Sequence, residues 1–483
     1  MSVSKNYLYN VLLIISNTVF PIITFPYVSR VLMPEYLGKV YFVQGVIGYF
    51  LILSVLGAPN YGIKELSKAK GIGDWEEFKK IFTELFLMTV LSSVVSLGIL
   101  LFTVSIYGRF YQEKMIFYIF GLQVLFECFH INHFFIVMEN HKRRLIRSFV
   151  IRILSLGFLF YFIKKPSDYY LYALLLVIPE VIARIIDVIT VRKYFNFNFK
   201  ELRFKRHMNS MMVIFLYLFT IGIYGSIDTT MLGIMVGDTE VGLYSAAVKM
   251  YRMVLPVILT LGTVLSPRII GAIKRKEKNN IYKNLDIFID YCFIVGVPAT
   301  VLMVILAPEF TLLFSGKSFE GAISTMMIMS PCLGFLALGS FIGGQILLPN
   351  DLERDILIIS IAGVFINIGL NYFLIPIYLR NGAALATLLT EVVIALIKIY
   401  KMKKVYKDYS ILNRDRNITI FVGIGVSIFI FWIIQHIRVY GNLITLLTMP
   451  ILYGIIYFLI LILLKNKRVG EWFEFAKKKA RLH

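Results

Sequence analysis

Charged residues are scarce in this sequence, and acidic residues are the scarcest. Asp, Glu, Lys and Arg make up 16% of the 483 residues, with 29 acidic residues against 50 basic ones. A soluble globular domain carries about 25% charged residues. With 58% hydrophobic residues and a mean hydropathy of +0.77, the chain falls outside the soluble class and has the composition of a polytopic membrane protein.

Cysteine is also scarce. The three cysteines, Cys128, Cys292 and Cys332, all lie in apolar stretches and show no metal-ligand spacing. We therefore expect three inert core residues, and the sequence predicts neither a metal site nor a cofactor.

The chain also lacks a polar segment large enough for a soluble domain. Apolar stretches of about twenty residues, the length that crosses a bilayer, follow one another with short connections. Because backbone in hydrocarbon must satisfy its hydrogen bonds internally, these stretches are expected to be helices. The predicted fold is an all-α polytopic membrane protein with about fourteen transmembrane helices. The predicted spans are 7–31, 40–63, 81–107, 115–138, 146–164, 168–190, 210–236, 241–266, 286–307, 321–348, 355–378, 381–400, 417–437 and 442–464.

Basic loops alternate with nearly uncharged ones along the chain. Alternate loops hold 37 of the 50 basic residues, whereas the intervening loops hold nine. Such an excess marks the cytoplasmic side, so both termini are predicted to be cytoplasmic. Membrane topology and anionic headgroups then explain the net charge of +21, and nucleic acid is not an expected partner. The stretch 7–31 is too long for a signal-peptide core and lacks a small-residue cleavage site, so we expect it to be the first span.

Two halves of the chain resemble each other. Residues 34–38 (PEYLG) match 238–242 (DTEVG) at a separation of 204, and 179–183 (PEVIA) match 390–394 (TEVVI) at 211. Six crossings return the chain to the same side, so the copies are predicted to be parallel lobes with a cleft between them. The predicted domains are an N-lobe of six helices at 1–200, a C-lobe of six helices at 201–408, and two further helices with a basic tail at 409–483. Chance similarity among apolar helices is the alternative.

Four basic residues fall outside every loop: Arg152, Arg184, Lys249 and Arg252. Arg147 and Lys398, near the ends of predicted spans, are assigned to the neighbouring basic loops. Each costs about 2.5 to 3.5 kcal/mol near the bilayer centre, so such groups normally face protein or a water-filled cavity. Lys249 and Arg252 are three residues apart and share a helix face, with no acid at helical spacing in their span. An unpaired basic face fits an anionic substrate, because Arg offers a bidentate fork for phosphate. The alternative is that Asp228, in the seventh span, pairs with one of them as a structural contact.

Carboxylates also fall inside spans. The sixth span carries Glu180, Arg184 and Asp187 at spacings of four and three, which predicts a self-neutralising ladder along one face. We expect these charges to form a buried ion network that holds two helices together, rather than a functional site. The matching helix of the C-lobe keeps Glu391. Glu180, Glu391 and Asp228 are the carboxylates that we name as candidates for coupling transport to an ion.

Other polar groups are less specific. Arg30 closes the first span behind two prolines that predict a bend, and it either lines a cavity or reaches the outer headgroups. His130 and His133 are expected to make polar helix contacts rather than bind a metal. Asp286 and Asp290 are expected to be solvated acids near the cytoplasm.

Four segments of the chain resemble a known family. They are FPYVSRVLMPEYLGKVYF (25–42), LGAPNYGIKELSK (56–68), SIDTTMLGIMVGDTEVGLYSAAVKMYRMV (226–254) and NGAALATLLTE (381–391). These segments are similar to the Wzx-type oligosaccharide flippases of bacteria. That family belongs to an exporter superfamily that also contains multidrug antiporters and peptidoglycan-precursor flippases.

The resemblance implies a function. It is that of a two-lobed transporter of the bacterial plasma membrane, which moves an undecaprenyl-diphosphate-linked oligosaccharide from the cytoplasmic to the outer leaflet by alternating access, for capsule or O-antigen synthesis. Membrane lipids and other polysaccharide-assembly proteins are the implied partners. The family's cavities are cationic, so the resemblance nominates as substrate-binding residues Arg30, Lys249, Arg252, Asp228, Arg152 and Arg184.

Two transporters and an enzyme are the alternatives. A multidrug antiporter needs an intramembrane carboxylate to exchange a cation against the drug, and the first span holds none before Glu35. A peptidoglycan-precursor flippase shares the diphosphate lipid. A polysaccharide polymerase is expected to have large external loops, whereas the longest here, 108–114 and 307–320, are short. The chain is therefore not expected to be an enzyme.

Overall fold

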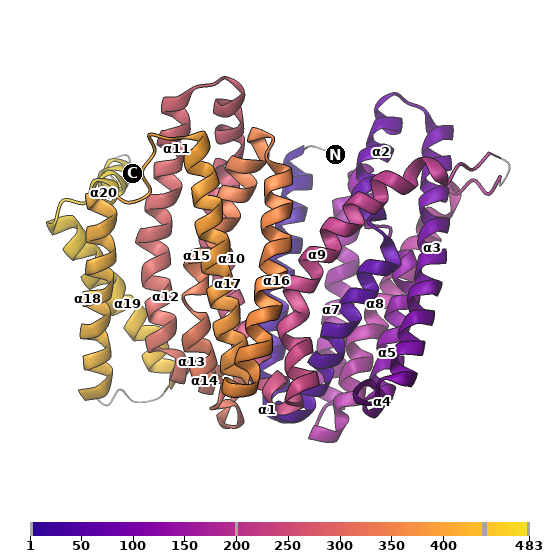
Figure 1. Ribbon diagram of the computed structural model, residues 1–483, viewed down its shortest axis with the longest axis horizontal. Coiled ribbons are helices and arrows are strands. Elements are labelled where there is room, and N and C mark those ends of the chain that lie inside the picture. Colours follow the sequence, from indigo (N-terminus) through magenta and orange to yellow (C-terminus); the bar gives the residue numbers. More distant parts are fainter. Residues whose placement is uncertain (1–2, 199–200, 437–441, 481–483) are drawn as a thin grey trace. The chain divides into compact units, whose positions relative to one another are not determined.

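The computed structural model describes residues 3–198, 201–436 and 442–480, and all regular structure in these ranges is helical (Figure 1). Eleven of the described segments are long and apolar enough to cross a membrane. The prediction of an all-α polytopic membrane protein is confirmed, whereas the count of fourteen spans stays a prediction.

Three local features explain why eleven segments are long and apolar enough to cross a membrane, whereas fourteen spans were predicted. The segment Phe20–Gly71 covers the first two predicted spans, and Met33, with a φ of 63°, interrupts its long helix just before Pro34. The predicted span 115–138 is broken into short helices. The predicted span 168–190 is a continuous helix but carries three charged residues, which lower its apolar character.

The chain folds as two compact units, Met1–Gly242 and Leu243–His483. In the first unit, α1 packs against α3, α5, α7 and α9. Its helices are α1 (Val3–Val55), α2 (Ala58–Gly71), α3 (Trp75–Ile106), α4 (Gly108–Gln112), α5 (Lys114–Leu125), α6 (Asn132–Val137), α7 (His141–Phe162), α8 (Tyr169–Val191) and α9 (Lys205–Met235), with short helices η1 (Phe126–Phe129), η2 (Pro166–Asp168) and η3 (Arg192–Tyr194). The predicted lobe boundaries at 200 and 408 rest on the internal repeat and stay a prediction.

The second unit contains most of α10 (Asp238–Lys274) and the helices that follow it. Its centre is α17, which packs against α14, α15 and α16, while α18 and α19 pack against α12 and α13. The helices are α11 (Lys278–Tyr291), α12 (Val297–Ile305), α13 (Ala307–Ser315), α14 (Ala322–Met329), α15 (Cys332–Phe341), α16 (Glu353–Tyr378), α17 (Arg380–Val405), α18 (Arg414–His436), α19 (Asn442–Leu463) and α20 (Lys467–Ala480), with η4 (Cys292–Gly296), η5 (Lys317–Phe319), η6 (Ile342–Leu347) and η7 (Leu348–Asn350).

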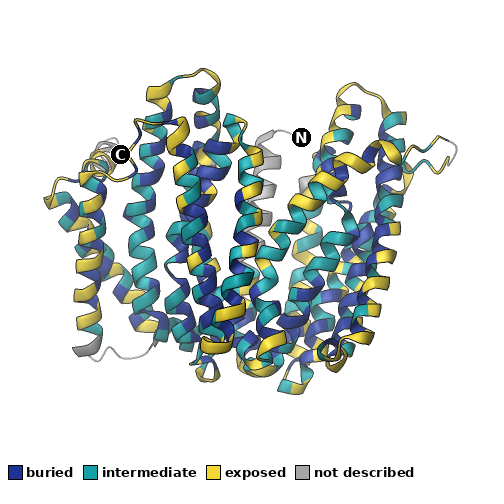
Figure 2. Cartoon of the chain, viewed as in Figure 1, coloured by how far each residue is buried: buried dark blue, intermediate teal, exposed yellow. Residues whose placement is uncertain are grey.

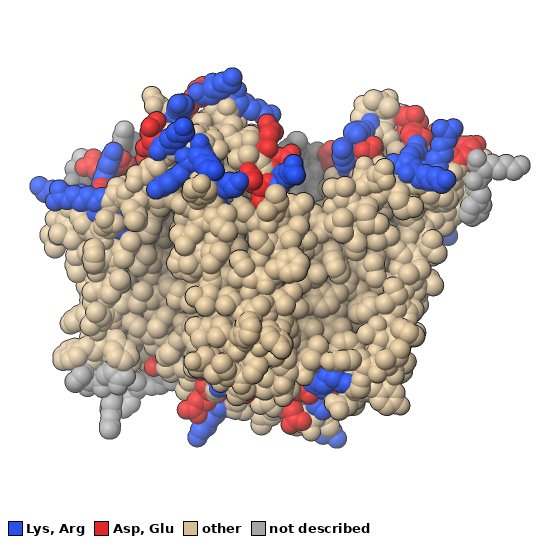
Figure 3. Space-filling model, viewed as in Figure 1, with Lys and Arg blue, Asp and Glu red and all other residues tan. Residues whose placement is uncertain are grey.

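Within each unit, charged side chains gather at the helix ends and leave a band without charge between them (Figure 3). Large apolar side chains are exposed on this band, among them Phe149 and Ile153 on α7 and Phe365 and Phe373 on α16. Exposed and buried residues share the same helices (Figure 2). Apolar surface of this extent is costly in water and is what lipid contact requires.

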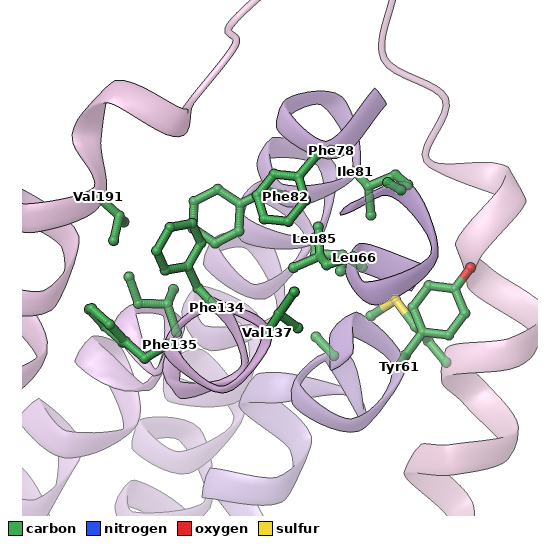
Figure 4. Close-up of a cluster of buried hydrophobic side chains, with 14 residues drawn as sticks. Tyr61, Leu66, Phe78, Ile81, Phe82, Leu85, Phe134, Phe135, Val137 and Val191 are labelled. Atoms are coloured by element: carbon green, nitrogen blue, oxygen red, sulfur yellow. The ribbon is translucent and has the colours of Figure 1, made fainter. Parts of the chain in front are cut away.

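A compact aromatic core holds the second half of the predicted fourth span in place. Phe134 and Phe135 of α6 are buried with Phe78 and Phe82 of α3 (Figure 4). The Phe82 and Phe134 rings lie 5.2 Å apart, a distance at which aromatic pairs attract beyond simple burial. This packing anchors α6 although the helix before it is broken.

Two glycines pack reciprocally in the first unit. A Cβ on Gly38 would overlap the carbonyl oxygen of Asp238, and a Cβ on Gly242 would overlap that of Pro34. At the repeat separation of 204, Gly38 matches Gly242 and Pro34 matches Asp238. Such a reciprocal contact is what a two-fold relation between matched segments produces. The repeat motif is thus also a close helix contact that tolerates no side chain.

Gly38→Ala and Gly242→Ala are expected to lower stability by about 1 to 3 kcal/mol each, because two backbones must separate to admit a methyl group. Gly98→Ala in α3, where a Cβ meets no atom within 4 Å, is the matched control. Thermal unfolding of the purified variants in detergent measures the difference. Equal unfolding temperatures for the three variants would contradict the packing described.

The largest fully buried side chain among the described residues is an arginine. Arg416, 2% exposed, donates to Asp286 at 2.5 Å and to Asp290 at 2.6 Å. Arg468 also donates to Asp290, at 3.0 Å. Burial raises the pKa of Tyr409, whose protonated hydroxyl donates to Asp286 at 2.8 Å. This cluster, which lines a pocket, joins α11, α18 and α20 in the second unit.

The expectation of solvated acids at Asp286 and Asp290 is corrected by this cluster. Asp290 is ion-paired and only 15% exposed, so the expectation is wrong for it. Asp286 is 42% exposed but also paired, so the expectation holds for it only in part. The partners Arg416 and Arg468 lie 126 and 178 residues along the chain from Asp290, which no local pattern shows.

Arg416→Ala is expected to destabilise the protein by about 3 to 5 kcal/mol, because it leaves two carboxylates without their buried partner. Arg414→Ala, two residues away and exposed, should change stability by less than about 0.5 kcal/mol. Denaturant unfolding of both variants compares them. If Arg416→Ala and Arg414→Ala unfold at the same denaturant concentration, the cluster does not stabilise the fold.

Candidate functional site

Lys249 and Arg252 lie one helical turn apart on α10, in the part that belongs to the second unit. Lys249 is half-buried and Arg252 is exposed. Between them, Tyr251 is 3% exposed, and its hydroxyl lies within electrostatic reach of Arg252 and Glu391. Both cations interact with other groups, so the expectation of an unpaired basic face is corrected. The shared helix face is as predicted.

The opposing polar groups of the second unit are on α17. Glu391 is buried, 5% exposed, and lies within electrostatic reach of Tyr251. Lys398 lies seven residues further along the same helix and is half-buried within electrostatic reach of Glu391. Its ammonium lies against Gly343, 3.4 Å from the position that a Cβ would take there.

Lys398 is a residue that sequence reasoning missed, since it was grouped with the basic loop after the twelfth span. The structure places it inside α17, seven residues before the helix ends at Val405. Gly343 belongs to η6, a π-helical turn that widens the backbone beside it. π-helical turns are frequent at functional sites. The seven-residue spacing from Glu391, two helical turns, was the available signal.

In the first unit, ions pair between helices. Arg184 on α8 forms an ion pair with Glu127 at 2.5 Å and donates a hydrogen bond to the backbone oxygen of Gln123 at 3.2 Å. Asp187, also on α8, pairs with Arg147 on α7. Arg184 and Asp187 thus pair with other helical elements and not with each other along one face of the sixth span. The expected ion network that joins helices describes these contacts.

Glu180 and Arg152 lie in the same part of the unit. Glu180 is exposed and within electrostatic reach of Arg147 and Arg152. The Arg152 guanidinium lies 5.9 Å from the ring of Phe20 on α1, a cation–π distance. Arg147, which sequence reasoning assigned to a loop, is thus a third intramembrane cation of this unit beside Arg152 and Arg184.

Arg30 and Asp228 lie on α1 and α9. The Arg30 side chain is exposed, and its Nη1 donates to the Pro26 oxygen at 2.7 Å. Asp228 is 8% exposed, near the hydrogen bond of 3.0 Å between Tyr49 and Thr230 that joins α1 to α9. Both residues have further interactions. The structure thus places Arg30 at a helix surface and Asp228 at a helix contact.

His130 makes the polar contacts that were expected of it, with Glu127 at 2.8 Å and Asn132 at 2.7 Å. The expectation is wrong for His133, because neither of its buried ring nitrogens makes a hydrogen bond with the described residues. No cluster of metal-binding side chains occurs among the residues that the structure describes. The three cysteines are buried and free, as predicted. Each unit therefore offers cations and carboxylates on helices of membrane-spanning length, chemistry that suits binding of an anion and exchange of a proton or cation.

Comparisons with known proteins agree with this chemistry. The family model described as polysaccharide biosynthesis protein matches residues 3–272, more than half of the chain. A putative O-antigen transporter of Shigella dysenteriae is 24% identical over 80% of this chain and 97% of its own length. Another of Escherichia coli K12 is 21% identical over 81% of this chain and 94% of its own length.

Solved structures share the fold. A lipid II flippase, MurJ, in an inward closed conformation superposes with a TM-score of 0.72 at 14% identity, covering 94% of this chain and 98% of that one. An inward-facing multidrug transporter of the MOP superfamily gives a TM-score of 0.64 at 15% identity, covering 81% and 96%. These relatives are transporters rather than enzymes, and the resemblance found in the four sequence segments is confirmed. The chain belongs to the polysaccharide biosynthesis protein family.

Proposed function

We propose that this protein is a flippase that moves an undecaprenyl-diphosphate-linked oligosaccharide from the cytoplasmic to the outer leaflet of the bacterial plasma membrane by alternating access, with both termini in the cytoplasm. The product would serve synthesis of a cell-surface polysaccharide such as O-antigen or capsule. Membership of the polysaccharide biosynthesis protein family and two relatives described as O-antigen transporters support the substrate class.

The observation that carries the proposal is the pair Lys249 and Arg252, one turn apart on a membrane-spanning helix. Each cation costs about 2.5 to 3.5 kcal/mol near the bilayer centre. A favourable interaction with a substrate or with the rest of the protein must offset this cost. The diphosphate is the one part that such lipid-linked sugars share, and Arg binds it with two parallel hydrogen bonds. The cations would therefore recognise every substrate whatever its sugar.

Other polar groups have supporting roles in this proposal. In this proposal Lys398 joins Lys249 and Arg252 as a third cation for the diphosphate. Glu391, within electrostatic reach of Lys398, offsets part of the positive charge when no substrate is bound. Arg30, Asp228, Arg152 and Arg184 are proposed to line the path in the first unit. Arg184 forms an ion pair with Glu127 at 2.5 Å. It could contact the substrate directly only if this pair opens during transport.

Lys249→Ala and Arg252→Ala are expected to abolish transport while leaving the protein abundant in the membrane. Arg252→Lys should retain part of the activity, because it keeps the charge but loses the fork. Lys274→Ala, at the exposed end of the same helix, is the matched control. Surface polysaccharide and protein level, measured in a strain that depends on the plasmid copy, report both effects. Normal polysaccharide in both alanine variants would remove these cations from the site.

Deleting the protein is expected to trap lipid-linked repeat units at the cytoplasmic face. Accessibility of the units to an external, membrane-impermeant reagent distinguishes the two leaflets. Units that remain accessible from outside in a strain without a second flippase would contradict the proposed function.

A further inference from the structure

The predicted fourth span is not one helix in the structure. It runs as α5 to Leu125, as the tight turn η1 to Phe129, through His130 and Ile131 without regular helix, and again as α6 from Asn132. A break inside a membrane span leaves backbone groups without helical partners, and transporters place ion sites at such breaks. The break here carries four polar side chains: Glu127, His130, Asn132 and His133.

His130 is held at both ring nitrogens. Its Nδ1 lies 2.8 Å from Glu127 Oε1, and its Nε2 lies 2.7 Å from the amide nitrogen of Asn132. Because an amide nitrogen only donates, Nε2 accepts and Nδ1 carries the proton that is donated to Glu127. The arrangement is that of neutral His130 with every ring hydrogen bond satisfied.

Asn132 can also satisfy the charged ring. Its Oδ1 is buried and makes no hydrogen bond with the described residues. Rotating the amide by half a turn would bring this oxygen to Nε2, where it accepts the second proton of an imidazolium. No existing hydrogen bond of Oδ1 is lost in the rotation, so the site has two complementary hydrogen-bonded states that differ by one proton.

A proton on His130 would place a positive charge beside an existing ion pair. Glu127, 7% exposed at its side chain, also forms an ion pair with Arg184 on α8 at 2.5 Å. The next charged groups are Arg147 of α7 and Asp187 of α8, which pair with each other. The small pocket beside His130 is otherwise lined by uncharged groups of residues 55–59 and α3, together with Cys128 and His133.

His133 strengthens the case for a site at the break. It is 6% exposed, it lines the same pocket, and neither ring nitrogen makes a hydrogen bond with the described residues. A buried imidazole without partners is costly unless water or an ion satisfies it in another state. His130, in contrast, is 34% exposed at its side chain.

We infer that His130, with Glu127 and Asn132, forms a proton-binding site at the break in the fourth span, and that this site couples proton movement to the proposed transport. The proton adds to the lone pair of Nε2, and the Asn132 amide turns, so that its hydrogen bond to Nε2 is replaced by one from Nε2–H to Oδ1. No covalent bond is broken. An imidazolium next to Glu127 competes with Arg184 for the carboxylate, and thereby loosens the tie between η1 and α8. A proton that binds the two arrangements of α8 with different affinity shifts their populations.

Nitrogen magnetic resonance of the full-length protein in lipid bilayers, labelled at histidine, tests the site without any transport substrate. The signal lost in His130→Gln identifies His130. As the buffer is acidified, this signal should pass from the neutral Nδ1-protonated form to the imidazolium, the form that holds the bound proton. In Asn132→Ala, which removes the acceptor, the change should need at least about tenfold more acid, the effect of about 1.4 kcal/mol.

A signal that stays neutral throughout, or a change that is the same in Asn132→Ala, would overturn the inference. Asn140→Ala is the matched control for Asn132→Ala, because it makes the same substitution at an exposed position eight residues away, and it should leave the His130 change in place.

Flipping in proteoliposomes under an imposed pH gradient tests the coupling, which rests on the proposed function. The wild type should flip lipid-linked oligosaccharide faster with the gradient, and His130→Gln should lose that acceleration. Flipping whose rate ignores the gradient, or an acceleration that survives in His130→Gln, would overturn the coupling but leave the flippase intact. No flipping by the wild type would refute the proposed function and the coupling together, whereas the resonance measurement would still decide whether His130 binds the proton.

Discussion

A charge inside the bilayer must find a partner, and this requirement organises both units. In the first unit it ties three helical elements together, because Arg184 reaches from α8 to Glu127 of η1 and Asp187 reaches from α8 to Arg147 of α7. In the second unit, Arg416 is buried only because carboxylates and backbone oxygens surround it. Removing either partner of such a pair leaves a buried charge, so the pairs fix helix positions even where their net contribution to stability is small.

Apolar packing and close glycine contacts supply what the ion pairs do not. Gly38 and Gly242 let backbones approach where any side chain would collide. The aromatic core around Phe82 and Phe134 holds α6 against α3 although the helix before α6 is broken. A rigid surround of this kind allows a break in a membrane span to persist and to place His130 between Glu127 and Asn132.

Features that depend on a single helix could be predicted from the sequence, whereas contacts between two helices could not. Hydropathy predicted the helical membrane fold, and three-residue spacing predicted the shared face of Lys249 and Arg252. The pairing of Arg184 with Glu127, 57 positions apart, follows from helix packing that no local spacing encodes. Lys398 was missed because a lysine near the end of an apolar run looks the same whether it reaches a headgroup or packs against Gly343.

The central claim is that positive side chains on membrane-spanning helices recognise a diphosphate headgroup. Equilibrium binding of undecaprenyl diphosphate and of undecaprenol to the purified full-length protein in detergent tests it most directly, because the two lipids differ only in the headgroup. The account predicts binding of the diphosphate lipid at least about tenfold tighter, as one or two charge-assisted hydrogen bonds would give, with the preference weakened by salt. Equal affinity for the two lipids would contradict it.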